Sequence, residues 1–582
     1  MKPLFVLGLA CLLPALTAQE ATQPDNFEKL LPRQPFVELR IKNPKKLWQD
    51  IVKSRMGRVI QAPSMEMLRE AWNTSFELRQ LYVIISTLTG VDKQAAGELF
   101  QILKGVEGDV RLAYFPPLPP PGLGGWILEI EGEKALLARA HKALVTGMGA
   151  DPVAEEGNVA LLGAEHACFK QKAAAWRFVT PFEVEGKLYF AAWQDPDGAR
   201  LLTGAPGPGN PKGRKMSVRS KLAEQRMDLA VVVDMRDLMA MVQQQYESEG
   251  IQRDEFLQFA KLLGVHEIHT MRLGLDIKRG RIVHELRAEV AEGGRFAKFL
   301  GSILPREGRA VGLLEFQPKG VRTSAMISLD LPTAYAEFTR LVKEGSREFG
   351  GEEIDIEEAG EQFLGISLKE DLIDPLDGRI LFFEGDKFVE KEKKKRSGFC
   401  LGLGTSKPEK TGETMVKLFE KSGFVKQDES EYKGFTIHNY DFSFLWSKTT
   451  IRYAMTGRFF LFGFGAAGHD YLRKVIDSEK LGEEERFRPA GDLKAQLTLV
   501  PQESATLVWA NTVVAAGSLL EIWAGNLARV TVEDEEVAED PSAKVLKSLT
   551  ENLAPLLEKE GLATTLSGLG RDRGGFWIRW IW

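Results

Sequence analysis

The stretch FLGISLKEDLIDPLDGRILFFE, residues 363–384, decides the predicted fold, and a looser copy, LTGVDKQAAGELFQILKGVEGDVRLAY, occupies residues 88–114. In both copies a Gly closes one element, an apolar and a capping residue follow, and after a short helical run a second Gly opens an apolar strand. The residues that carry this pattern are Gly90, Asp92 and Gly108 in the first copy and Gly365, Ser367, Glu370 and Gly378 in the second. Gly adopts the left-handed conformation past a helix end at low cost, and Asp and Ser are strong N-caps. Ser367 and Glu370 also have the spacing of a capping box. We interpret these residues as structural and the chain as a tandem repeat.

A second pair of similar stretches supports the repeat. FEVEGKLYFAA at 182–192 aligns with YAMTGRFFLFG at 453–463, and each has a hairpin turn containing Gly. Alternating strands joined by short turns indicate antiparallel sheet, and amphipathic runs between them indicate helices on one face. The predicted fold class is therefore α+β, in two tandem copies at 36–305 and 306–582.

The first residues have the features of a targeting segment. Lys2 precedes an apolar run at 4–13, and Leu16-Thr17-Ala18 is a small-residue cleavage site, so we expect a signal peptide at 1–18 and a polar lead at 19–35. Cys11 raises the alternative of lipid attachment, although Gly8-Leu9-Ala10 fits a lipidation site poorly. Since no other apolar run approaches the length of a spanning helix, we expect no transmembrane span in the mature chain. The expected location is periplasmic or extracellular.

Composition excludes some classes of protein. A formal charge of −6 over 582 residues gives no electrostatic footprint for nucleic acid. Only Cys168 and Cys400 remain after cleavage, so the chain is no disulfide scaffold. We expect two buried thiols, and a single bridge is the alternative in an oxidising compartment.

The order of these elements resembles that of a broad family of exported bacterial proteins with a duplicated domain of unknown function. The resemblance rests on the signal peptide, the repeated Gly-apolar-Asp/Ser…Gly-strand motif, and the strand that follows Lys433-Gly434. It covers most of 30–582 and implies a fold, without catalytic residues to carry over.

Two patterns suggest chemistry, and each also has a structural interpretation. Gly463-Phe-Gly465-Ala-Ala-Gly468 matches the dinucleotide motif GxGxxG, but the preceding strand is predicted to be a hairpin arm rather than the start of a βαβ unit. We therefore interpret it as close backbone packing at a helix start. His266 and His269 could join His284 as zinc ligands, but a spacing of three along a strand sends two side chains to opposite faces. We assign no cofactor, metal or catalytic residue.

Two loops at equivalent places of the repeat differ in character. PPLPPPGLGG at 116–125 is stiff and proline-rich, and KEKKKRSG at 391–398 is basic. The candidate partner-binding residues are Pro116, Pro119, Pro120 and Pro121 in the first loop and Lys391, Lys393, Lys394, Lys395 and Arg396 in the second. Polyproline and basic segments can bind partners, although loops also tolerate drift in composition.

Three classes of function follow from the sequence. The preferred hypothesis is an exported, non-enzymatic binding or scaffold protein of the cell envelope, whose partner is an envelope protein, polymer or lipid. The alternatives are a carrier of lipid or another apolar ligand in a groove between sheet and helices, and a hydrolase whose site is assembled from distant residues. No GxSxG or CxxC motif supports the hydrolase.

Overall fold

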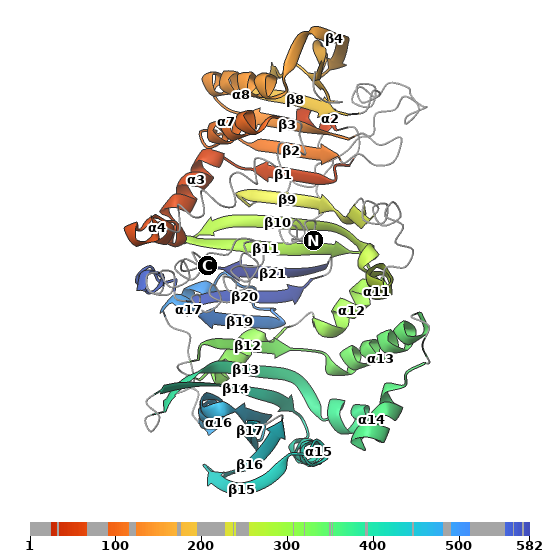
Figure 1. Ribbon diagram of the computed structural model, residues 1–582, viewed down its shortest axis with the longest axis vertical. Helices are drawn as coiled ribbons and strands as arrows, with labels where there is room; N and C mark the ends of the chain where they lie inside the picture. Colours follow the sequence, from red (N-terminus) through yellow and green to blue (C-terminus); the bar gives the residue numbers. More distant parts are fainter. Residues whose placement is uncertain are drawn as a thin grey trace, which may run out of the picture. The chain divides into compact units, whose positions relative to one another are not determined.

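The structure is a computed structural model of the whole chain. It describes residues 25–31, 34–66, 91–115, 124–171, 176–194, 227–236, 238–239, 255–305, 308–318, 321–348, 351, 353–389, 394–444, 447–480, 491–511, 553, 555–562, 564–572 and 575–582. The chain is α+β, with antiparallel strands and helices in both of its compact parts (Figure 1). Within these residues, no helix combines the length and the apolar character needed to cross a membrane.

The chain divides into two compact units. Unit 1 comprises Met1–Gln252, His269–Glu289 and Glu551–Leu553, and unit 2 comprises Arg253–Ile268, Val290–Thr550 and Ala554–Trp582. This division follows contacts, whereas the repeat expected at 36–305 and 306–582 was drawn from sequence similarity, so the duplication stays a prediction here.

Unit 1 is built on an antiparallel sheet. Its strands are β1 (Val37–Ile41), β2 (Val110–Phe115), β3 (Gly125–Glu131), β4 (Ala150–Leu161), β5 (Ala164–Gln171), β6 (Arg177–Val179), β7 (Phe182–Val184), β8 (Lys187–Trp193), β9 (Leu229–Asp234), β10 (Ile268–Lys278) and β11 (Arg281–Val290). Its helices are α2 (Asn26–Leu30), α3 (Pro44–Lys53), α4 (Arg55–Gln61), η1 (Pro63–Met65), α7 (Lys93–Leu103) and α8 (Lys134–Gly147). The pairings give the order β10–β9–β1–β2–β3–β8–β6–β5–β4, and β7 also pairs with β8.

Both faces of the central strands of unit 1 are buried, because β3 and β8 are apolar at nearly every position. On one face α7 and α8 pack side by side over Trp126, Leu128 and Phe190. On the other face Phe27 of α2 joins Ile127, Trp193 and their neighbours in a second core cluster. The short helix α2 is held by Asp25, whose carboxylate accepts from the Glu28 N–H, while the backbone N–H of Asp25 donates to the Glu28 carboxylate in return.

Unit 2 contains a second antiparallel sheet. Its strands are β12 (Thr323–Ser328), β13 (Leu376–Val389), β14 (Lys394–Thr405), β15 (Val425–Tyr432), β16 (Phe435–Phe444), β17 (Ser447–Met455), β18 (Phe459–Phe464), β19 (Thr506–Asn511), β20 (Thr564–Arg571) and β21 (Gly575–Ile581). Its helices are α11 (Glu255–Leu263), η2 (Val265–Glu267), α12 (Arg295–Ile303), η3 (Ala310–Phe316), α13 (Leu331–Glu348), α14 (Ile356–Leu364), η4 (Leu368–Ile373), α15 (Pro408–Lys421), α16 (Gly465–Lys480) and α17 (Gly491–Leu497). The strand order is β21–β20–β19–β12–β13–β14–β18–β17–β16–β15.

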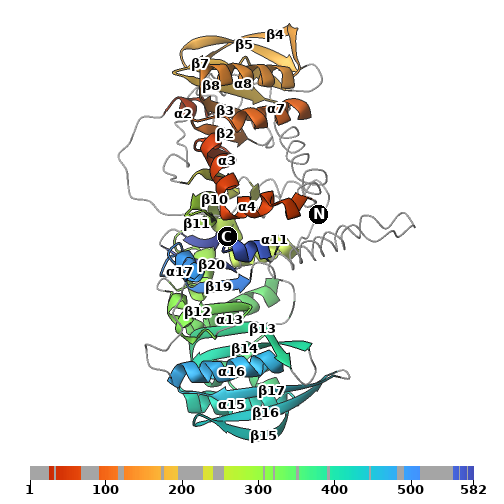
Figure 2. The ribbon, with the colours of Figure 1, turned by 90° about the vertical axis from the view of Figure 1, so that its left-hand side faces the viewer.

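Helices cover both faces of the sheet in unit 2, which corrects the expectation of helices on one face. Met415 of α15 packs with Tyr453 and Phe460 on one face. On the opposite face α16 lies across β14 (Figure 2). It also contacts β18, and Leu461 of that strand and Leu472 of the helix are both fully buried. The physical reason is that β18 carries large apolar side chains at both alternating sets of positions, with Phe460 and Phe462 on one face and Leu461 on the other, so neither face can be left to water.

Two hairpin turns contain an X-Gly pair with positive φ, and the first of them is the turn predicted within 182–192. Glu185 and Gly186 have φ of 53° and 76°, and Arg279 and Gly280 have φ of 54° and 73°. Two consecutive residues with positive φ match the right-handed twist of the flanking strands, and Gly reaches this region without strain.

Candidate functional site

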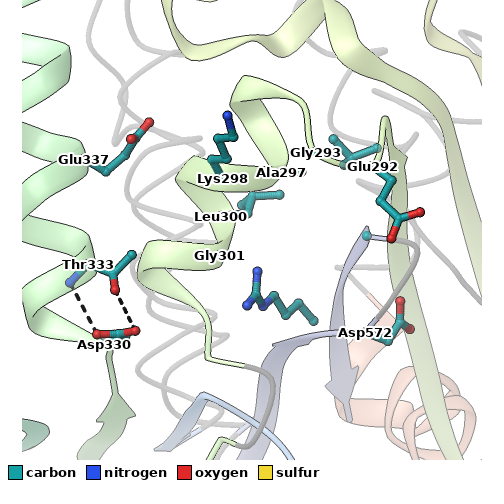
Figure 3. Close-up of a pocket in the computed structure, with 13 residues that line it drawn as sticks. Glu292, Gly293, Ala297, Lys298, Leu300, Gly301, Asp330, Thr333, Glu337 and Asp572 are labelled. Atoms are coloured by element: carbon teal, nitrogen blue, oxygen red, sulfur yellow. Dashed lines mark hydrogen bonds between the residues drawn. The ribbon is translucent and has the colours of Figure 1, made fainter.

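A cavity of about 520 Å³ opens on unit 2 beside the N-terminus of α13 (Figure 3). Its lining comes from three separate stretches of the chain: the end of β11 with α12, the start of α13, and the turn between β20 and β21. The lining residues are Val290, Glu292, Gly293, Ala297, Lys298, Leu300, Gly301, Asp330, Thr333, Glu337, Arg571, Asp572 and Gly575. Cavities that bind small molecules generally have volumes of a few hundred to about 1,000 Å³, so this one has the size of a ligand site.

Local sequence explains why α13 begins at the cavity. Asp330 precedes the helix, and its carboxylate accepts from the backbone N–H of Thr333 at 3.3 Å and from the Thr333 hydroxyl at 2.8 Å (Figure 3). These bonds satisfy a donor that the first turn of a helix would otherwise leave unpaired. Glu337, one turn after Thr333, lies on the same side of α13, so Asp330, Thr333 and Glu337 form one polar wall.

The opposite wall depends on close packing between α12 and β20. A Cβ added to Gly301 would lie 2.3 Å from Arg571 Nη1, so the absence of a side chain at Gly301 lets the guanidinium of Arg571 lie against α12. Lys298 projects from the same helix, and Glu292 and Asp572 lie on the far side of the cavity (Figure 3).

The cavity is charged with both signs. Four carboxylates and two cations line it, but they are not equally available. Glu337 accepts from Nε of Arg340 at 3.0 Å, and Asp330 is engaged in the cap of α13. Among the described residues, Lys298 and Glu292 form neither a hydrogen bond nor an ion pair through their side chains. One free ammonium and one free carboxylate are therefore presented to the cavity.

The lining offers binding groups rather than a nucleophile with its base. It contains no His, Cys or Ser, and the hydroxyl of Thr333 is committed to Asp330. Nucleophilic catalysis requires a hydroxyl or thiol within hydrogen-bond reach of a base that is itself oriented by a third group. The lining can therefore hold a polar ligand, but it contains no nucleophile with an oriented base.

Sequence reasoning did not find this cavity. Lys298, Arg571 and Glu292 belong to no motif and are far apart in the chain. The signal that could have been recognised is Asp330 three residues before Thr333, which marks the start of α13 but not a ligand site.

The residues of the repeated motif lie elsewhere, at element ends. Asp92 caps α7 by accepting from the N–H groups of Gln94 and Ala95 at 2.8 and 3.0 Å. A Cβ at Gly108 would lie 2.4 Å from the Glu131 carbonyl oxygen. Gly90 lies outside the described residues.

The second copy of the motif shows one difference from the expected capping box. Gly365 ends α14 with φ of 64°, and Ser367 accepts from the Glu370 N–H at 3.1 Å. The Ser367 N–H, however, donates to Asp371 at 3.1 Å rather than to Glu370. Because η4 is a π-helix with wider turns, the residue four positions on replaces the residue three positions on.

Gly378 allows β13 to start against the end of β12. Its φ is 83°, and its carbonyl accepts from the Leu329 N–H at 2.9 Å. A Cβ there would lie 2.0 Å from the Leu329 carbonyl oxygen, so only Gly fits this approach.

The two expected partner loops are only partly described. Pro116, Pro119, Pro120, Pro121, Lys391 and Lys393 lie outside the described residues. Lys394, Lys395 and Arg396 are not in a loop: they belong to β14 and pair with Val389, Phe388 and Lys387 of β13. β14 therefore begins earlier than the sequence suggested. Strands pair through their backbones, so charged residues can extend a hairpin where the partner strand β13 is present.

The GxGxxG stretch has a packing explanation. β18 is a hairpin arm that pairs antiparallel with β17, and α16 begins at Gly465, whose φ is 71°. A Cβ at Gly463 would lie 2.9 Å from the Gly468 carbonyl oxygen. The glycines let the first turn of α16 lie directly on the sheet.

Histidines and cysteines form no metal centre in the described parts of the chain. No group of three or more His, Cys, Asp or Glu side chains there could hold a metal ion. Cys168 and Cys400 are both buried, and neither forms a disulfide. Burial alone raises the pKa of the Cys400 thiol far above its usual range.

Comparisons with known proteins add little to this picture. No protein-family model matches the chain, and no curated protein matches it. One solved structure with some likeness is titled "Structure of crystal form III of TP0453". It shares 9% identity with this chain, covers 48% of this chain and 87% of its own, and superposes with a TM-score of 0.20. A likeness at that level carries no argument about fold or function.

Proposed function

We propose that this protein is an exported, non-enzymatic binding protein of the cell envelope that takes a small zwitterionic ligand in the cavity of unit 2. The observation that carries the proposal is the pair of unengaged charges, Lys298 and Glu292, in a cavity of about 520 Å³. An ammonium and a carboxylate without protein partners match a ligand that carries both charges.

The lining favours this ligand over the two alternatives. An apolar carrier would need a mostly apolar cavity, and here Val290, Ala297 and Leu300 are interspersed with six charged side chains. A hydrolase would need a nucleophile or an activated water, and the lining supplies no nucleophile–base pair. Export is inferred from the segment at 1–18 alone.

The test is ligand-observed NMR on the full mature chain with three probe sets: small zwitterions such as betaines and amino acids, monoamines, and dicarboxylates. We expect saturation transfer to zwitterions only, and its loss in Lys298→Glu and in Glu292→Lys. The double variant Lys298→Glu/Glu292→Lys exchanges the charges and should recover part of the binding. Lys410→Glu, at an exposed ion pair with Asp371, is the charge-matched control.

Absence of binding to every probe, or equal binding by wild type and both single variants, would reject the cavity as the site. Turnover of any probe, seen as new resonances, would reject the non-enzymatic assignment.

Macromolecular partners are a separate expectation that rests on sequence alone. Replacing 116–121 or 391–396 with Gly and Ser should weaken capture of envelope components in a pull-down. Because Lys394–Arg396 pair within a strand, the second replacement is also expected to lower the melting temperature, so 390–393 is the cleaner target.

We also infer that the units derive from one duplicated domain. The two sheets share the same order of antiparallel pairings over eight strands. That order is β9–β1–β2–β3–β8–β6–β5–β4 in unit 1 and β19–β12–β13–β14–β18–β17–β16–β15 in unit 2. Experimental structures of the two units, superposed on these strands, test the inference, and unrelated helix positions between matched strands would contradict it.

A further inference from the structure

A second site of unit 2 lies under α16, away from the cavity. Cys400, Gly463, Arg452 and Asn439 are register partners in a row across β14, β18, β17 and β16. Gly463 faces α16, since a Cβ there would lie 3.3 Å from the backbone nitrogen of His469. Residues directly opposite one another in a sheet share a face, so Arg452 and Asn439 also project toward α16.

Two further basic side chains approach this row from α16. His469 and Arg473 are four residues apart and therefore lie on one side of the helix. The guanidinium carbon of Arg473 lies 5.3 Å from the ring centroid of Tyr432 on β15, which places Arg473 over the outer strands of the sheet. Arg452 projects toward the helix face that carries His469 and Arg473, and burial, followed by the charge of Arg473, lowers the pKa of Arg452.

The neighbouring carboxylates are engaged by other groups. Asp428, at the end of the row, accepts from Nδ2 of Asn439 at 2.5 Å and only partly offsets the charge of Arg452. Asp477 accepts from the Tyr432 hydroxyl at 3.0 Å and pairs with Lys433 at 2.8 Å. Within the described ranges, no ion pair joins Arg452 or Arg473 to a carboxylate.

Several polar atoms of the cluster also lack hydrogen-bond partners. The Nε of Arg452, the Oδ1 of Asn439 and the Nε2 of His469 are buried, and none is hydrogen-bonded to a described residue. A buried charged donor without a partner costs free energy, and two neighbouring guanidinium groups repel each other. An anion that bridges them removes both penalties.

We propose that Arg452 and Arg473 form a binding site for a phosphate group, with His469 beside them. Each guanidinium presents a planar set of N–H donors that matches two oxygens of an oxyanion. Two such groups from different elements, β17 and α16, suit an anion with more than two oxygens and a charge near −2, which favours phosphate over a single carboxylate. Arg473 on α16 is exposed and Arg452 on the sheet is half-buried. The phosphate group therefore enters from solvent past Arg473 and contacts Arg452 on the sheet.

The primary experiment is a calorimetric titration of the full mature chain with inorganic phosphate at constant ionic strength. We expect Arg452→Gln and Arg473→Gln each to weaken phosphate affinity at least about tenfold, as loss of a charge-assisted contact predicts. Lys410→Gln removes one positive charge from the same unit and should leave the affinity within about twofold, because screening limits distant charges. Arg473 is exposed, so its variant should keep the wild-type melting temperature in chloride buffer.

Asp428 provides a second, opposite test. Asp428→Asn removes the carboxylate that competes for Arg452, and phosphate affinity should rise several-fold. If Asp428 were instead the permanent partner of Arg452, this variant would lower stability without any gain in affinity, and the proposal would be overturned. It would also be overturned if wild type failed to bind phosphate at millimolar concentration, or if Lys410→Gln weakened binding as much as the arginine variants.

The source of the phosphate group is decided by vesicle sedimentation. Capture on phosphatidylcholine vesicles that contain phosphatidylglycerol, lost in Arg452→Gln and Arg473→Gln, assigns a lipid headgroup. Binding of inorganic phosphate without vesicle capture assigns a soluble phosphate compound. Each outcome supports the site, and neither depends on the cavity ligand proposed above.

Discussion

Gly468 lies so close to β14 that a Cβ added to it would be 2.0 Å from the carbonyl oxygen of Phe399. The obstacle is backbone, which cannot rotate away as a side chain can. α16 therefore rests on the sheet at its first turn, and this contact sets where His469 and Arg473 lie above Arg452.

Gly468→Ala should consequently lower the free energy of unfolding by about 1–3 kcal/mol, as overpacking does. Gly457→Ala is the matched control, since nothing lies within 4 Å of its added Cβ. Chemical denaturation of both variants is the measurement. A stable Gly468→Ala protein would contradict the packing explanation of GxGxxG, and NAD or ATP binding by wild type would revive the nucleotide site.

Arg111 and Glu129 form a buried charge pair in unit 1, 3.9 Å apart. They are register partners on β2 and β3 with relative exposures of 6% and 1%, and Arg111 also donates to Asp25 at 2.5 Å. Arg111→Met leaves the Glu129 carboxylate buried with less compensation, so we expect a loss of about 3 kcal/mol in stability.

The exposed pair of Lys45 and Glu107 in the same unit supplies the control. Lys45→Met should leave the free energy of unfolding nearly unchanged, because exposed ion pairs contribute little. In a double-mutant cycle, Arg111→Met/Glu129→Gln should lose less than the sum of its single variants. An additive result would show that the two charges do not interact.

His469 should make stability depend on pH in the acid range. Burial, and then the charge of Arg452, lowers the pKa of His469 to about 4 from an ordinary 6.5, and the charge of Arg473 lowers it further. Between these values the unfolded chain binds a proton that the folded chain does not, so stability falls as pH drops from about 6.5 to about 4.

This pKa difference between the folded and unfolded states corresponds to a loss of at most about 3 kcal/mol of stability. Because the ring is partly open to solvent, we expect about 1–2 kcal/mol. Unfolding at pH 7 and pH 4.5 in phosphate-free buffer measures it. His469→Asn should lose this part of the pH dependence, and His438→Asn on β16 should keep it. An equal acid loss in wild type and His469→Asn would assign the effect to other groups.

Cys168 and Cys400 should be inert to thiol reagents in the native state. Both are buried and unbridged, and the raised pKa of Cys400 suppresses its thiolate, which is the reactive form. In the native mature protein we expect no labelling by iodoacetamide, and after denaturation we expect two labelled cysteines. Denatured protein that labels only after reduction would show a disulfide instead.

The sequence by itself was enough to predict the α+β class and the local conformations that few residues control. Gly365, Asp92 and the pair Glu185-Gly186 act through their own backbone and their near neighbours, so their roles are visible in short windows. The capping partner of Ser367 was missed because a π-turn replaced the expected spacing.

Tertiary structure alone decided the two candidate sites. Lys298, Asp330 and Arg571 line one cavity only because α12, α13 and β20 pack together, and Arg452 faces Arg473 only because Gly468 admits α16 onto β14. Likewise, whether one or both faces of the sheet in unit 2 needed helices depended on which strands became neighbours. Contacts of this kind arise between residues far apart in the chain, and their energy depends on burial and distance, which no local pattern encodes.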